Sequence, residues 1–146
     1  MNKQPSLIKI LTIDYFAFMA CLVPIVIWGF YFVFVNMQKV DPGDYTLPVI
    51  FGVITLIALA VIAWRVREIL SIFDDGLEAQ ATIGNVFFFR DRGRVDYSYT
   101  FQGQNYVGGN ALHKVKQTQA LAAGQQVTVM VDRNNPKKAY LRDLYL

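Results

Sequence analysis

Two long apolar segments, Tyr15–Val35 and Leu47–Trp64, contain no Asp, Glu, Lys or Arg and fill most of the N-terminal half of the chain. A helix needs about 20 apolar residues to cross the hydrocarbon core of a bilayer, which is roughly 30 Å thick. Both segments reach or approach that length. The first also exceeds the apolar stretch of a signal peptide, which runs to about 7–15 residues. The sequence therefore predicts a hairpin of two transmembrane helices.

The charges beside the apolar segments predict which way the hairpin faces. Lys3 and Lys9 precede the first segment, and Arg65 and Arg67 follow the second, whereas the loop Asn36–Thr46 carries one Lys and two Asp. Lys and Arg resist translocation, so the side richer in them stays in the cytoplasm. We expect both termini to be cytoplasmic in a multi-pass protein of the cytoplasmic, or bacterial inner, membrane.

Asp14 is the one acidic residue at the edge of an apolar segment. In an antiparallel hairpin it starts the first helix beside the end of the second, which brings it near Arg65 and Arg67. An ion pair that latches the hairpin, or a helix cap, is the simpler interpretation, and proton or ion handling is the alternative. Because a lone carboxylate makes no pathway, we do not expect a transporter or channel.

The rest of the chain predicts a small all-β domain. The second helix is expected to continue to Phe73 and to stop at Asp74-Asp75-Gly76. Short strand-like segments with turn signals between them follow, and Val95–Phe101 alternates apolar and polar residues most cleanly. The expected strands are Leu77–Ile83 with its continuation Asn85–Phe89, then Val95–Phe101, Asn105–Gly108, Val127–Val131 and Ala139–Leu141. We expect a turn at Gly108-Gly109-Asn110 and a short helix or ordered loop within Ala111–Ala123.

The predicted architecture is thus a membrane α-helical hairpin followed by a barrel or sandwich-like β domain of four or five strands with one short helix. The hairpin takes residues 1–73, with spans near 15–35 and 47–64, and the β domain takes residues 77–146. So small a core rarely supplies more than about 3–5 kcal/mol. We therefore expect the β domain to pack against the helix end, the membrane surface or a partner subunit.

The β region also resembles a bacterial family of membrane proteins, in which a domain of unknown function follows one or two membrane helices. The shared order is E-A-x-A-T-I, Y-S-Y-x-F, G-x-x-Y, G-x-x-V-x-V and D-x-x-N-P. The matching positions are Ala81, Tyr97, Tyr99, Phe101, Gly103, Tyr106, Gly124, Val127, Val129, Asp132, Asn135, Pro136 and Leu141. The resemblance covers Leu77–Leu141, although the family more often has Pro where Arg133 stands. It implies a fold and a membrane location without implying a chemistry.

A cluster of cations follows three consecutive phenylalanines at the expected first hairpin. Guanidinium groups beside aromatic rings suit anionic lipid headgroups or a partner subunit. Stacking on single-stranded nucleic acid is the least favoured alternative, because the net charge is only +3. A solvated turn with Phe87 and Phe89 in the core is the plainest interpretation. The candidate contact residues are Arg90, Arg92, Arg94 and Phe88.

No residue pattern indicates catalysis. His113 is the only histidine and Cys21 the only cysteine, so a metal site lacks ligands. Ser71 and Ser98 have no basic partner at a recognisable spacing. We expect no catalytic, cofactor-binding or metal-binding residue and no cofactor.

These observations favour a non-enzymatic accessory or scaffolding subunit, or an interaction module, of a larger membrane complex. The expected partners are the lipid bilayer and a membrane protein or a second copy of the chain, with no nucleic acid. The alternative is a membrane-tethered sensor of a small molecule or lipid. That alternative requires a concave pocket lined by Tyr97, Tyr99 and Tyr106.

Overall fold

A helical hairpin and a curved sheet make up the computed structural model, which describes residues 4–37, 39, 41 and 43–146. Lys3, and part of the loop that enters the charge comparison above, lie outside the described residues. The elements are α1 (Leu7–Ile13), α2 (Tyr15–Asn36), α3 (Thr46–Asp75), β1 (Leu77–Phe89), β2 (Arg92–Phe101), β3 (Gln104–His113), α4 (Lys116–Gln119), β4 (Gln126–Val131), β5 (Ala139–Leu141) and α5 (Arg142–Tyr145).

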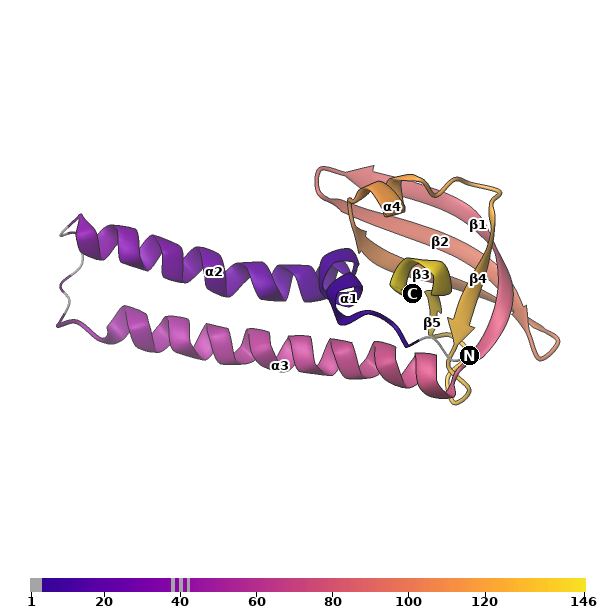
Figure 1. Cartoon of the computed structure of the whole chain (residues 1–146), viewed down its shortest axis with the longest axis horizontal. Coiled ribbons are helices and arrows are strands. Elements are labelled where there is room, and N and C mark those ends of the chain that lie inside the picture. The colour runs from indigo at the N-terminus through magenta and orange to yellow at the C-terminus, as the bar shows by residue number, and fades with distance from the viewer. Residues whose placement is uncertain (1–3, 38, 40, 42) are drawn as a thin grey trace.

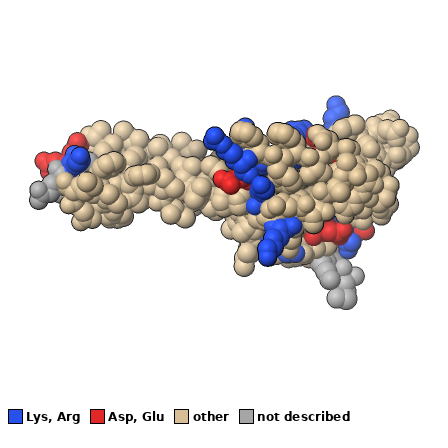
Figure 2. Space-filling view, turned by 90° about the horizontal axis from the view of Figure 1, so that it is seen from above, with Lys and Arg blue, Asp and Glu red and all other residues tan. Residues whose placement is uncertain are grey.

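The hairpin consists of α2 and α3, which lie side by side and extend away from the β domain (Figure 1). Both helices are long and apolar enough to cross a membrane. The chain itself buries none of the most apolar stretch of α2 and only 6% of that of α3. Trp28 Nε1 donates to Thr55 Oγ1 at 3.0 Å, which joins the two helices midway. In Figure 2 the charged residues lie at the two ends of the hairpin, and the length between them is bare of charge on that face.

The sheet is antiparallel with strand order β3-β2-β1-β4-β5, and it curves until its two edge strands approach each other. Side chains close the remaining gap. Asn110 Nδ2 donates to the Ala139 carbonyl at 3.0 Å, and Tyr97 Oη donates to the same carbonyl at 2.6 Å. The result is a near-barrel, in agreement with the predicted small β domain with a short helix.

One hydrophobic core serves the sheet and the ends of the helices. Val95, Val129 and Val131 from the strands are fully buried, and Ile10 and Ile69 from the helices join them. Each such side chain contributes about 1.5–3 kcal/mol when it leaves water. The expected packing of the β domain against the end of the second helix is therefore present.

The sequence did not predict α1. This helix ends at Asp14, where the backbone turns to an extended conformation with φ of −69° and ψ of 119°, and α2 begins at the next residue. Ile10 and Ile13 face the sheet and are 0% and 2% exposed. The segment before the first span is thus part of the β domain's core rather than a simple flank.

The turn expected at Gly108-Gly109-Asn110 is wrong, because β3 continues through these residues to His113. The glycines permit close approach instead of a turn. A Cβ on Gly108 would lie 2.8 Å from the ring of Tyr97, and one on Gly109 would lie 2.4 Å from Oδ1 of Asp96. The short helix expected within 111–123 is α4, and it begins only at Lys116 because β3 extends to His113.

Phe87 and Phe89 are not in the core: their side chains are 61% and 50% exposed. The register of β1 shifts between Ile83 and Asn85, where Gly84 forms a bulge. An extra residue in a strand moves every following side chain to the other face. Val86 and Phe88 therefore point inward instead, and the interpretation that buries Phe87 and Phe89 is wrong.

Candidate functional site

The first candidate site is the junction between the hairpin and the sheet, where Asp14 is completely buried. Its backbone ends α1 and starts α2, and its Oδ1 accepts from the Ala17 amide at 3.0 Å as an N-cap. A short side-chain acceptor in extended backbone is what a helix start requires. Asp14 also forms an isolated backbone bridge with Leu112 of β3, which ties this turn to the sheet edge.

Arg65 of α3 meets Asp14 with two nitrogens. Its Nη2 lies 2.7 Å from Oδ2 and its Nε lies 3.1 Å from Oδ1, so the guanidinium grips the carboxylate in a forked arrangement. The remaining Nη1 donates to Glu68 at 2.8 Å and to the Tyr140 hydroxyl at 2.7 Å. Lys138 completes the network by donating to Glu68 at 2.6 Å. The network joins α2, α3 and β5.

The neighbouring charges favour the ionised forms of Arg65 and Glu68. Burial alone would lower the pKa of Arg65, but the hydrogen bond and charge of Asp14 outweigh it and raise that pKa. Burial likewise favours neutral Glu68, yet Lys138 and Arg65 hold its pKa below the ordinary value. The junction is therefore a charged structural joint, in which the charged side chains form their ion pairs and hydrogen bonds with one another.

Arg67 does not take part in this joint. Its side chain is exposed and lines a surface hollow on α3 with Trp64, Glu68 and Ser71. Of the three residues predicted to latch the hairpin, the structure brings together Asp14 and Arg65 and leaves Arg67 apart. Arg65 and Arg67 are two positions apart, and residues at that spacing do not lie on the same face of a helix, so Asp14 can meet only one of them.

The joint also includes residues that sequence reasoning missed. The Tyr145 side chain is 0% exposed, and its hydroxyl is the buried side-chain polar atom that lacks a hydrogen-bond partner among the described residues. Lys9 Nζ donates to the carbonyl of Leu146, and His113 stacks on Phe18 with ring centroids 3.9 Å apart. Only the apolar spacing of Ile10 and Ile13 could have indicated that α1 reaches this region.

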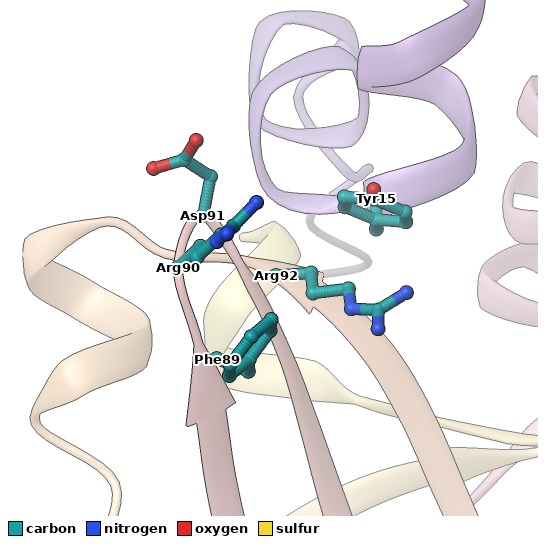
Figure 3. Close-up of a pocket in the computed structure, with 5 residues that line it drawn as sticks. All are labelled: Tyr15, Phe89, Arg90, Asp91 and Arg92. Carbon is teal, nitrogen blue, oxygen red and sulfur yellow. The ribbon is translucent and has the colours of Figure 1, made fainter.

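The second candidate site is the end of the β1–β2 hairpin. We call Phe87, Phe89, Arg90, Arg92 and Arg94 together the hairpin-end cluster. All five side chains are exposed. The guanidinium carbons of Arg90 and Arg92 lie 5.4 and 5.9 Å from the centre of the Phe89 ring. Figure 3 shows Phe89, Arg90 and Arg92 beside Tyr15, the first residue of α2.

Phe88, predicted to make the same contact as the arginines, lies differently. Its ring is half-buried and covers Gly93 on the neighbouring strand, where an added Cβ would come within 2.3 Å of it. The exposed rings next to the arginines are instead those of Phe87 and Phe89. The exchange of faces follows from the bulge at Gly84, which a glycine within a strand permits but does not by itself indicate.

The tyrosines that a sensor would need around its ligand are packed inside the sheet. Tyr97 and Tyr99 are 1% and 3% exposed. Their hydroxyls donate to backbone carbonyls of the chain itself, at Ala139 for Tyr97 and at Pro136 for Tyr99. Tyr106 stacks on Tyr99 with ring centroids 5.8 Å apart. Tyr97 and Tyr99 therefore make their contacts within the chain itself.

Comparison with known proteins identifies the sheet region. A family model described as a domain of unknown function (DUF3592) matches residues 81–144. The match covers most of the C-terminal β region. The match runs from β1 into α5, in agreement with the predicted domain of unknown function over nearly the same residues. No curated protein matches the chain, and no solved structure matches it.

Among the described residues, no group of three or more His, Cys, Asp or Glu side chains could hold a metal ion. The two sites described above offer two capacities. The junction can fix the β domain to the helices, and the hairpin-end cluster can present cations and aromatic rings to an outside anion.

Proposed function

We propose that the chain is a non-enzymatic two-pass membrane protein, whose DUF3592 domain is an interaction module held in a fixed pose against the bilayer. The observation that carries this proposal is the uncovered apolar surface of α2 and α3. Side chains such as Ile25, Phe32, Leu56 and Ile57 are between 59% and 70% exposed. Apolar surface of that extent is stable in lipid or against other apolar helices.

The charged joint supports the second half of the proposal. Asp14 and Arg65 connect both helices, and Tyr140 and Lys138 connect them to the sheet. A domain tied by a buried network keeps its orientation relative to the helices. Such a fixed orientation suits an accessory or scaffolding subunit, because the exposed surface of the domain then meets a partner at a defined height above the membrane.

The same proposal places the protein in a bacterial inner membrane with both termini on the cytoplasmic side. The cations Lys9, Arg65 and Arg67 lie at the β-domain end of the hairpin, whereas the described part of the far loop carries Lys39 against Asp41 and Asp44. The supporting rule is the retention of Lys and Arg on the cytoplasmic side. We further propose a membrane protein or a second copy of the chain as the partner, with no nucleic acid.

Fractionation followed by native size analysis tests this function. The full chain is expected to stay with membranes through alkaline carbonate washing. In mild detergent it should migrate above the monomer mass, with a stoichiometric partner or a second copy. Release by carbonate would overturn the membrane assignment. A monodisperse monomer without a co-purifying protein would overturn the accessory role and leave the membrane assignment intact.

A further inference from the structure

The end of the β1–β2 hairpin points toward the helical hairpin, whereas the β2–β3 end points away from it (Figure 1). It lies beside Tyr15, where α2 begins. If α2 crosses the bilayer as proposed above, Tyr15 marks the level of the headgroups, where aromatic residues with a polar tip prefer to lie. The hairpin-end cluster is then at the same level.

A groove of about 400 Å³ separates the first turn of α2 from this hairpin. Tyr15 and Phe16 form one wall, and Phe87, Arg92 and Arg94 form the other. A second hollow of about 330 Å³ adjoins it and is lined by Tyr15, Phe89, Arg90, Asp91 and Arg92. Arg92 is common to both. The groove thus has cationic groups on one wall and, on the other, a ring that continues into the apolar surface of α2.

The arginines are available for an outside anion. Arg94 pairs with Asp96 at 2.7 Å, but no ion pair of Arg90 or Arg92 occurs within the described part of the chain. In Figure 3 the carboxylate of Asp91 points away from the guanidinium of Arg92, which extends toward the Tyr15 side. Arg90 occupies the turn with φ of 55°, a conformation that favours glycine, so an arginine stands where the backbone alone would prefer another residue.

We propose that this groove and the adjoining hollow together bind an anionic phospholipid, with the phosphate at Arg90 and Arg92 and an acyl chain along Phe87 and Phe16. The inference rests on the membrane crossing proposed above. The groove is amphipathic in the sense that a phospholipid requires, because its cations face the headgroup level and its apolar wall leads along α2. Arginine suits a phosphate through its forked N–H groups.

The test uses the purified full chain in mild detergent with added phosphatidylglycerol or phosphatidylcholine, and native mass spectrometry counts retained lipid. The wild type should retain phosphatidylglycerol preferentially. Arg90→Gln combined with Arg92→Gln should bind it about 30-fold more weakly, since each cation near an anionic surface contributes about 1 kcal/mol. Ala111→Trp, which fills the groove without changing charge, should weaken binding as well.

The matched control is Arg133→Gln combined with Lys137→Gln, which removes the same charge from an exposed turn before β5. Unchanged affinity of this control supports a local site. An equal loss in the control, or undiminished binding by the groove variants, would overturn the proposal in favour of diffuse electrostatic attraction. Inorganic phosphate that competes as tightly as the lipid would overturn a lipid site in favour of a free-anion site.

Carbonate washing of the same variants in vesicles separates this inference from the function on which it rests. A chain that washes off refutes both. A chain that remains inserted but shows no preference for phosphatidylglycerol refutes only the lipid site.

Discussion

Arginine is used in two opposite ways around the first turn of α2. The Arg65 side chain is 12% exposed, and its nitrogens donate to Asp14, Glu68 and Tyr140. Arg90 and Arg92 are exposed, and their guanidinium groups lie near the Phe89 ring. A buried guanidinium must find its acceptors within the chain, whereas an exposed one remains available to another molecule. Burial therefore separates the arginine that serves the fold from those that can serve a partner.

The strongest way to break this comparison is Asp14→Ala, which leaves Arg65 buried beside fewer acceptors. Removing one member of a buried pair destabilises by about 3–5 kcal/mol. Urea or thermal unfolding of the detergent-solubilised chain measures the loss. Asp74→Ala, which removes an exposed carboxylate from the same molecule, is the control and should leave the midpoint unchanged. Equal midpoints for both variants would contradict a structural role for the pair.

A second test concerns α1, which holds the turn at Asp14 against the sheet. Ile10→Ala removes a side chain that is 0% exposed and should lower stability by about 2–5 kcal/mol. Ile8→Ala changes the same residue type where it is 73% exposed, and we expect little effect. The two midpoints, measured under one condition, decide whether α1 belongs to the core. Indistinguishable variants would remove α1 from it.

High pH should lower the stability of the fold through its buried tyrosines. Burial raises the pKa of Tyr97, Tyr140 and Tyr145 above the ordinary value of about 10. The folded chain therefore keeps these phenols protonated where the unfolded chain loses its protons. The contribution of these tyrosines to the free energy of unfolding is constant below about pH 10 and falls as the pH rises above it. Urea midpoints across this range, followed with tyrosinate absorbance, should show the fall, and a flat profile would contradict it.

Tyr145→Phe tests the buried hydroxyl that has no hydrogen-bond partner among the described residues. Removing it should be neutral or should raise stability by about 1 kcal/mol, because an unpaired buried polar group is unfavourable. Tyr97→Phe is the matched variant, since it removes a hydroxyl bonded to Ala139 and Asn110, and it should lower stability. Unfolding midpoints give both values. A larger loss for Tyr145→Phe than for Tyr97→Phe would reverse this interpretation.

The smallest effect on stability is expected for the exposed arginines of the β1–β2 hairpin. Replacing Arg90 and Arg92 together with Gln should change the free energy of unfolding by less than about 0.5 kcal/mol, as exposed substitutions usually do. The same unfolding assay as for Asp14→Ala provides the contrast. A large loss would show that these arginines also serve the fold.

The main elements could be predicted because their patterns depend on solvent and period. The uncharged runs fixed the positions of both helices to within a few residues, and the alternation in Val95–Phe101 places Tyr97 and Tyr99 inside the sheet. The pairing of Asp14 with Arg65 also follows from an antiparallel hairpin. These features need only local sequence and one rule of geometry.

Other features depend on contacts between distant residues and could not be read locally. The bulge at Gly84 exposes Phe87 and Phe89, although an unbroken alternation would bury them. The extension of β3 through Gly108 depends on the ring of Tyr97 from the adjacent strand. Likewise, α1 is too short to be stable by itself and exists through its packing against the core.

The packing of α1 also has a consequence for how the chain folds. The Ser6 amide donates to the Tyr145 carbonyl at 2.9 Å, so the core closes between residues near opposite ends of the described chain. Contacts between residues so far apart in sequence form slowly, because a long loop must first be closed. The antiparallel hairpin shortens that loop once Arg65 has met Asp14. Assembly of the two helices is therefore expected to be the step that sets the rate at which the β domain completes its core.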